Sequence, residues 1–236
     1  MPERESLSQR AVASIRHPLT RALLVLTFTT GLVDAASYLG IGHVFSANMT
    51  GNIVLLGFGI AGAGGLPVLA PMVSLAAFLV GAGVGGLLAA QLAQHHPRHV
   101  ASALAIETFL VGAAAALSAA IDIRPNALSG DVVIALLALA MGVRNTTVRK
   151  IAVPDLTTTV LTMTLTGLAA DSPLFGGSGK GSTRRAAAVV AMLAGAVAGA
   201  LLLKTSLALP LAAAALLALT TWLVYIPAAR RDVGAS

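Results

Sequence analysis

Long runs of apolar residues follow one another along this chain, separated by short stretches in which charged and polar residues gather. A helix crosses the core of a bilayer with about 20 consecutive apolar residues, within a range of about 17–25. Four runs reach that length easily, and two more do so with polar residues near one end. The pattern therefore predicts six membrane-spanning helices, at Ala22–Ile41, Leu69–Leu92, Val100–Ile121, Val132–Val148, Ala186–Leu203 and Leu207–Ile226.

Two further apolar pieces, Met49–Ala61 and Thr157–Ala170, are too short for an ordinary span. A helix of about 12 residues is about 18 Å long, roughly half of a 30 Å bilayer core. Such pieces are more often re-entrant or broken helices than spans. We expect an all-α integral membrane protein with six transmembrane helices and two short re-entrant helices. Seven or eight spans remain the alternative.

The positions of the basic residues favour six crossings. Lys and Arg gather in the cytoplasmic loops of membrane proteins. With six crossings, only Arg124 and Lys204 of the 15 basic residues face the side opposite the N-terminus. With eight crossings five residues would face that side, namely Arg98, Arg144, Arg149, Lys150 and Lys204. The preferred topology places both termini in the cytoplasm.

Composition agrees with a membrane protein. Apolar residues make up 57% of the chain and charged residues 10%, whereas soluble domains have about 25% charged residues. The mean hydropathy is +0.89. The net charge of +6 accompanies only 4% aromatic residues, and the basic residues flank the apolar runs. We therefore expect that the basic residues orient the spans in the membrane, and we expect no nucleic-acid partner. The lack of cysteine excludes thiolate chemistry.

The order of the predicted elements suggests an internal repeat. Each half of the chain reads span, short piece, span, span, and three crossings per half place the second half upside down. The sequence GLVDAA at 31–36 aligns with GVRNTT at 142–147, although only the glycine is identical. We expect a cytoplasmic tail at 1–20, a single transmembrane domain at 21–226 with repeats at 21–121 and 131–226, and a cytoplasmic tail at 227–236.

Two polar segments resemble a known family. GLVDAASYLGIGHVFSANMTGNIVLLG at 31–57 and LAMGVRNTTVRKIAVPDLTTTVLTMTLTGLAADS at 139–172 closely resemble the signature segments of the YoaK-like family. That family consists of bacterial multi-span membrane proteins classed as a domain of unknown function. The resemblance covers nearly the whole chain and implies a fold class and a location in the bacterial cytoplasmic (inner) membrane. One departure is Arg144, which stands where relatives usually carry Gln.

The same segments hold the candidate functional residues. Ionisable side chains inside membrane spans are costly and usually serve a function. Asp34 and Glu107 lie within predicted spans, and we consider both for ion coupling; a structural hydrogen bond is the alternative role for Asp34. Two half-helices that return from opposite faces would bring their positively polarised N-termini together near the midplane. The predicted solute path comprises Asp34, Ser37, Asn48, Thr50, Asn52, Arg144, Asn145, Thr157, Thr158, Thr159 and Thr162.

These residues favour a small-solute transporter or channel-like protein with a polar site at the midplane. A non-catalytic membrane scaffold or regulator is the first alternative, and an intramembrane enzyme on a lipid-linked substrate the second. We expect no enzyme, because HExxH and GxSxG motifs and a second nearby carboxylate are lacking. An inward-facing Arg144 would favour an anionic or zwitterionic solute. Homo-oligomerisation is left open by the sequence.

No cofactor or metal is expected. The glycine pattern at Gly81–Gly86 fits GxGxxG but lies inside an apolar run, where small residues pack helices together. The stretch GKGST at 179–183 lacks the earlier glycine and the residue order of a nucleotide-binding P-loop. The expected partners are therefore the lipid bilayer and a small solute.

Overall fold

The computed structural model describes residues 18–93, 95–151 and 161–234, and every regular element in these ranges is helical. The apolar runs form the helices, and the polar stretches between them form the turns. The long helices are α2 (Pro18–Ser37), α4 (Leu69–Gln91), α5 (His96–Ala120), α6 (Leu128–Ile151), α8 (Ser182–Leu203) and α9 (Ala208–Gly234), and the short ones are α3 (Met49–Ile60) and α7 (Leu161–Ala170).

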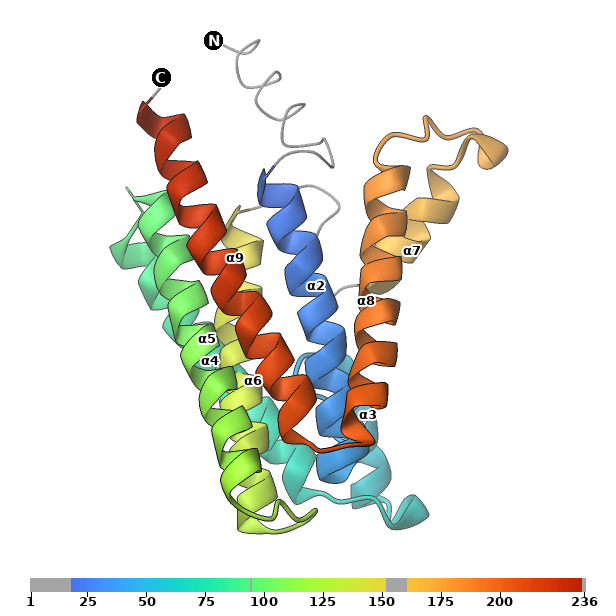
Figure 1. Ribbon diagram of the computed structural model, residues 1–236. Coiled ribbons are helices and arrows are strands. Elements are labelled where there is room, and N and C mark those ends of the chain that lie inside the picture. The colour runs from blue at the N-terminus through green and yellow to red at the C-terminus, as the bar shows by residue number, and fades with distance from the viewer. Residues whose placement is uncertain (1–17, 94, 152–160, 235–236) are drawn as a thin grey trace.

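The six long helices run between the two ends of one bundle (Figure 1). Helix α2 begins and α9 ends at the same end of the bundle, so the long helices pass through it an even number of times. Five described helices are long and apolar enough to cross a bilayer, and α9 adds a shorter apolar stretch, Ala208–Val224. The chain is thus an all-α membrane protein with several spans. The prediction for this fold class is confirmed.

The two short helices lie toward opposite ends of the bundle, α3 at the lower end and α7 at the upper end of the view (Figure 1). Helix α3 packs against α4, and α7 packs against α8. Arg185 on α8 also holds the end of α7, because its guanidinium donates to the Gly167 carbonyl at 2.7 Å and contacts Asp171 at 2.6 Å. Each short helix therefore leans on the long helix that follows it in the sequence.

Helix packing shows that the chain contains an inverted repeat. Helix α2 packs along α8 just as α4 packs along α6, and the α2–α9 contact corresponds to the α5–α6 contact. If α2, α3, α4 and α5 are exchanged in order with α6, α7, α8 and α9, the same set of contacts results. The α5–α9 contact is its own counterpart under this exchange. The two halves also run in opposite directions (Figure 1). The packing of the described helices is thus symmetric between the two halves, although only the glycine is identical in the aligned segments at 31–36 and 142–147.

Close glycine contacts repeat with the same geometry. At the α4–α6 crossing, Gly142 lies against the Phe78 carbonyl with no space for a Cβ atom, and Gly81 lies in the same way against the Leu139 carbonyl. The α2–α8 crossing repeats this pair of contacts, with Gly31 against the Met192 carbonyl and Gly195 against the Phe28 carbonyl. Small residues allow membrane helices to approach backbone to backbone.

The numbering confirms that these contacts are equivalent. Gly31 and Gly142 are separated by the same 111 positions as Phe28 and Leu139, which holds α2 and α6 in register. This register makes Asn145 the counterpart of Asp34 in the second repeat. At this position the first half carries a carboxylate and the second half an amide.

The helix bounds differ from the predicted runs mainly at their ends. Helix α5 starts at His96, four residues before the apolar run, with Pro97 in its first turn, where a missing N–H costs nothing. Helix α2 passes at Tyr38 into a π-helical turn that ends at Gly42, and His43 then adopts a left-handed φ of 57°. The first part of the predicted piece Thr157–Ala170 lies outside the described residues.

Candidate functional site

A cavity of about 440 Å³ lies between α2 and α8 and reaches the N-cap of α3 and the first described residues of α7. Asn48, the N-cap of α3, lines it from one side, and Leu161 and Thr162, the first residues described in α7, line it from another. The cavity thus touches the N-cap of α3 and the first described turn of α7. The remaining described lining is Thr30, Gly31, Asp34, Ala35, Tyr38, Leu39, Phe45, Ala47, Met192 and Ala196.

Asp34 joins α2 to the loop that precedes α3. Its Oδ1 atom accepts hydrogen bonds from the backbone N–H groups of Ser46 at 3.0 Å and Ala47 at 2.8 Å. The side chain is buried, with 6% of the residue exposed, and it borders the cavity. None of the hydrogen bonds among the described residues uses Oδ2. One oxygen is thus structural, and the other is left for a proton, water or a solute.

Asn52 holds the same loop from the side of α3. Its Oδ1 atom accepts from the Phe45 N–H at 2.8 Å, and its Nδ2 atom donates to the Phe45 carbonyl at 2.6 Å. Ser74 on α4 donates to that carbonyl as well, at 2.8 Å. This loop therefore has a fixed shape, held by side chains from α2, α3 and α4.

Two aromatic rings lie beside the carboxylate. Tyr38 and Phe45 stack with a centroid separation of 4.6 Å and an interplanar angle of 21°. Both line the cavity. Tyr38 opens the π-helical turn, and such turns occur frequently at functional sites. A carboxylate, an aromatic pair, Asn48 and Thr162 thus line one mostly apolar cavity.

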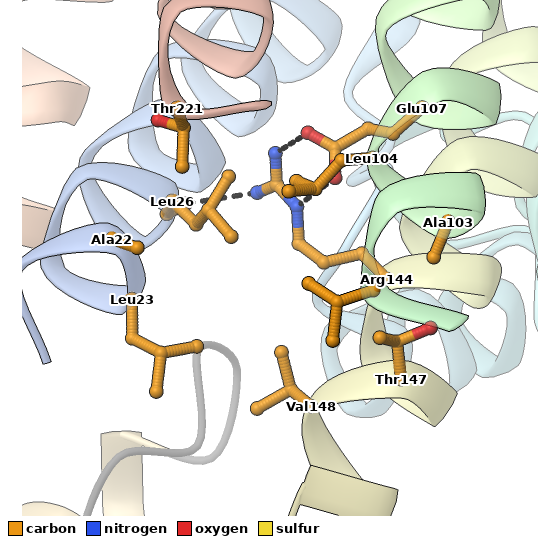
Figure 2. Close-up of a pocket in the computed structure, with 11 residues that line it drawn as sticks. Ala22, Leu23, Leu26, Ala103, Leu104, Glu107, Arg144, Thr147, Val148 and Thr221 are labelled. Atoms are coloured by element: carbon orange, nitrogen blue, oxygen red, sulfur yellow. Dashed lines mark hydrogen bonds and ion pairs between the residues drawn. The ribbon is translucent and has the colours of Figure 1, made fainter. Parts of the chain in front are cut away.

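Arg144, which we expected on the solute path, is not among the described residues that line this cavity, although it donates to Thr30, which does. Figure 2 shows its guanidinium directed toward Glu107 and Leu26, between α2, α5 and α6. Its Nε donates to Glu107 Oε2 at 2.8 Å, and its Nη2 donates to Glu107 Oε1. Adjacent residues on a helix point about 100° apart. Asn145 is the counterpart of Asp34 in the second repeat. Arg144 is the residue before it on α6, so its side chain points to a different face of the helix.

Every N–H donor of Arg144 is occupied. Besides the two bonds to Glu107, Nη1 donates to the Leu26 carbonyl and to Thr30 Oγ1, and Nη2 donates to Thr29 Oγ1, each at 2.8 Å. A guanidinium has five N–H donors, and these bonds use all of them. Arg144 and Glu107 are both almost fully buried, at 3% and 1% exposed. The pair is therefore a closed structural unit that ties three helices together.

The other predicted path residues have distinct places. Ser37 is buried and donates to the Asp34 carbonyl at 3.3 Å, and Thr50 is exposed on α3. Asn145 is half-buried and donates to the Met141 carbonyl at 2.8 Å. Of the predicted path, the structure brings together Asp34, Asn48 and Thr162 at the cavity. Thr157, Thr158 and Thr159 lie outside the described residues.

Sequence reasoning missed the aromatic pair and the small residues of the cavity wall. Tyr38 follows Asp34 by one helical turn, which could have placed it on the same face. Phe45 lies in a loop, where helical periodicity cannot predict the direction of a side chain. Met192 and Ala196 belong to α8 and reach the site because Gly31 and Gly195 let α2 and α8 approach closely.

Comparison with known proteins agrees with this architecture. A family described as "Protein of unknown function (DUF1275)" matches residues 22–224. The UPF0700 transmembrane protein YoaK of Bacillus subtilis (strain 168) is 36% identical over 150 residues, which are 63% of this chain and 65% of that relative. The match thus spans just under two thirds of the relative's own length. No solved structure matches the chain.

Proposed function

The chain belongs to the DUF1275 family, and on that premise we propose that it is a small-solute transporter or channel-like protein of the bacterial cytoplasmic membrane. Both termini would lie in the cytoplasm, in line with the distribution of basic residues. The observation that carries the proposal is the cavity beside Asp34, which is lined by the N-cap of α3 and by the first described residues of α7.

The fold around the cavity supports transport. Many secondary transporters consist of inverted repeats, with broken helices that meet at a site near the bilayer midplane. Here Asp34 lies eight residues before the end of the span Thr20–Gly42, about 12 Å along the helix axis. The carboxylate is thus near the middle of the bundle. A buried carboxylate at that depth is costly unless it serves a partner or a pathway.

The two repeats differ in the cavity at their helix crossings, and this difference supports a transport cycle with alternating access. The cavity borders α2 and α8, whereas at the equivalent α4–α6 crossing Thr146 donates a hydrogen bond across to the Ala82 carbonyl at 3.1 Å. In an inverted repeat, exchange of the two local conformations would open the opposite side. We propose that the solute binds beside Asp34 and leaves after such an exchange. No covalent chemistry is part of this proposal.

Transport by the purified protein in proteoliposomes tests the proposal. Uptake is measured for a panel of small cations, anions and zwitterions, with and without a pH gradient. At least one solute should enter faster than in protein-free liposomes, and Asp34→Asn should abolish that difference. Asn retains an oxygen for the Ser46 and Ala47 N–H groups, so the variant should insert and fold.

Asp122→Asn is the matched control, because Asp122 is an exposed carboxylate paired with Arg124 outside the cavity. It removes the same charge and should leave uptake unchanged. If Asp34→Asn transports normally, the assignment of the solute path to Asp34 is wrong. If no solute in the panel enters faster than in protein-free liposomes, the transporter proposal itself is wrong. A scaffold or regulatory role would then account better for the family.

A further inference from the structure

We propose that the solute bound in the Asp34 cavity is a small organic cation, with a protonated or quaternary amine placed beside Oδ2 of Asp34 and the Tyr38–Phe45 ring pair. This inference rests on the proposed function and names the solute class of the same site. It differs from the anionic or zwitterionic solute that the sequence favours. The difference arises from the charges that actually face the cavity.

Among the described residues that line the cavity, Asp34 is the only one with an ionisable carboxylate, and none of them is Lys or Arg. The segment 152–160 lies outside the described residues, but its sequence, AVPDLTTTV, contains no Lys, Arg or His. Arg149 and Lys150, just before it, are exposed and do not line the cavity. An anionic solute would therefore lie next to the Asp34 carboxylate, and neither the described lining nor the segment 152–160 has a Lys or Arg side chain to offset the repulsion.

The N–H donors of Arg144 are not free to bind an anion. Its five N–H donors already bind Glu107, the Leu26 carbonyl, Thr29 and Thr30. An anion could engage Arg144 only after breaking one of these buried bonds. The carboxylate of Glu107 also neutralises the guanidinium within the same unit.

The positive end of α3 is also largely occupied. Asn48 Oδ1 accepts from the Gly51 N–H at 3.1 Å, and Asp34 Oδ1 accepts from the two N–H groups just before the helix. Helix N-termini attract anions through such free N–H groups. Since the protein's own side chains use these N–H groups here, they are not available to an incoming anion.

The aromatic pair gives the site its preference for an organic cation. The faces of aromatic rings attract ammonium groups, and quaternary amines are recognised in this way. Tyr38 and Phe45 both line the cavity, and Phe45 belongs to the loop that Asp34 and Asn52 hold. The volume of about 440 Å³ is in the range of about 300–1,000 Å³ typical of ligand pockets.

Equilibrium binding to the purified protein in detergent tests the inference separately from transport. The probes are methylammonium, tetramethylammonium and choline. The matched solutes are 3,3-dimethyl-1-butanol, which replaces the choline nitrogen by carbon, glycine betaine, which adds a carboxylate, and acetate. Calorimetric titration should show binding of at least one cation, and weaker or no binding of its neutral and anionic counterparts.

Substitutions should separate the two parts of the site. Asp34→Asn should weaken cation binding about 10- to 100-fold, as expected for loss of one hydrogen bond or contact to a charged group. Tyr38→Leu should weaken it about 3- to 10-fold, and Tyr38→Phe should restore most of the affinity, because the ring is kept. Asp122→Asn should bind like the wild type.

The outcomes distinguish the inference from the proposed function. Preferential binding of acetate or glycine betaine, no binding of any of the three cations, or an unchanged cation affinity in Asp34→Asn would overturn the cation assignment. If another solute were still transported in an Asp34-dependent way, the transporter proposal would stand without it. Cation binding that depends on Asp34 and Tyr38, without transport of any solute, would support the assigned site and overturn transport.

Discussion

Replacing both Arg144 and Glu107 by apolar residues should leave the protein at least as stable as the wild type, whereas replacing either one alone should strongly destabilise it. The pair is almost fully buried between α2, α5 and α6. Removing one partner of a buried ion pair costs about 3–5 kcal/mol, because the other charge remains without its counterion. Replacing both by well-packed apolar residues is often neutral, or stabilising by about 1–4 kcal/mol.

The structure supports these values for Arg144→Met and Glu107→Leu. Arg144→Met alone removes the hydrogen-bond partners of both Glu107 oxygens. Glu107→Leu alone leaves two of the five donors of Arg144 unpaired. In the double variant, Thr29 and Thr30 each keep a hydrogen bond to the Leu26 carbonyl at 2.9 Å, so they are not left unsatisfied.

A double-mutant cycle measures this coupling. The free energy of unfolding is followed in mixed micelles, with the single tryptophan, Trp222, as the fluorescent probe. If the two losses were independent, they would add to about 6–10 kcal/mol. We expect the free energy of unfolding of the double variant to be close to that of the wild type, so the coupling energy should be about 6–10 kcal/mol. A double variant as unstable as the sum of the single ones would refute the reasoning.

Three further predictions follow from the packing and the topology. Gly142→Ala should lower stability in the same micelles by about 1–3 kcal/mol, because a Cβ meets the Phe78 carbonyl; Gly112→Ala, which meets open space, should change little, and equal losses would contradict the close crossing. In intact spheroplasts, an impermeant maleimide should label Ala63→Cys and spare Ala93→Cys until lysis, and the reverse pattern would refute the cytoplasmic termini. Asp34→Ala should increase hydrogen exchange of the loop before α3 while Asp34→Asn should not, because only Asn keeps an acceptor for that loop; equal exchange in both variants would show that Asp34 does not hold the loop.

The long helices and the repeat could be predicted from the sequence because they depend on local properties. Run length distinguishes α4 from α3, and the alignment of Gly31 with Gly142 gives the register that the helix crossings use. The short length of α3 and α7 also suggested that their N-termini would approach one site. Each of these inferences needs only hydrophobic length, order along the chain and direction.

The occupants of the site could not be predicted in the same way. Arg144 and Glu107 are 37 positions apart, and Arg144 and Leu26 are 118 apart, so no helical spacing relates them. Phe45 is oriented by Asn52 and Ser74, which come from two other elements. Adjacency to Asn145 suggested that Arg144 belongs to the site. Only the rotation of α6 in three dimensions shows that it faces elsewhere.

The exchanged packing of the two halves also constrains how the protein is made. The close glycine crossings join α2 to α8 and α4 to α6, so each crossing unites an early and a late part of the chain. During synthesis, α2 and α4 enter the membrane before their partners have left the ribosome. Their glycine faces must remain against lipid, or against other helices, until the second half is inserted. The bundle can therefore close only late in biogenesis, and a first half produced alone would lack the partners that its most closely packed surfaces require.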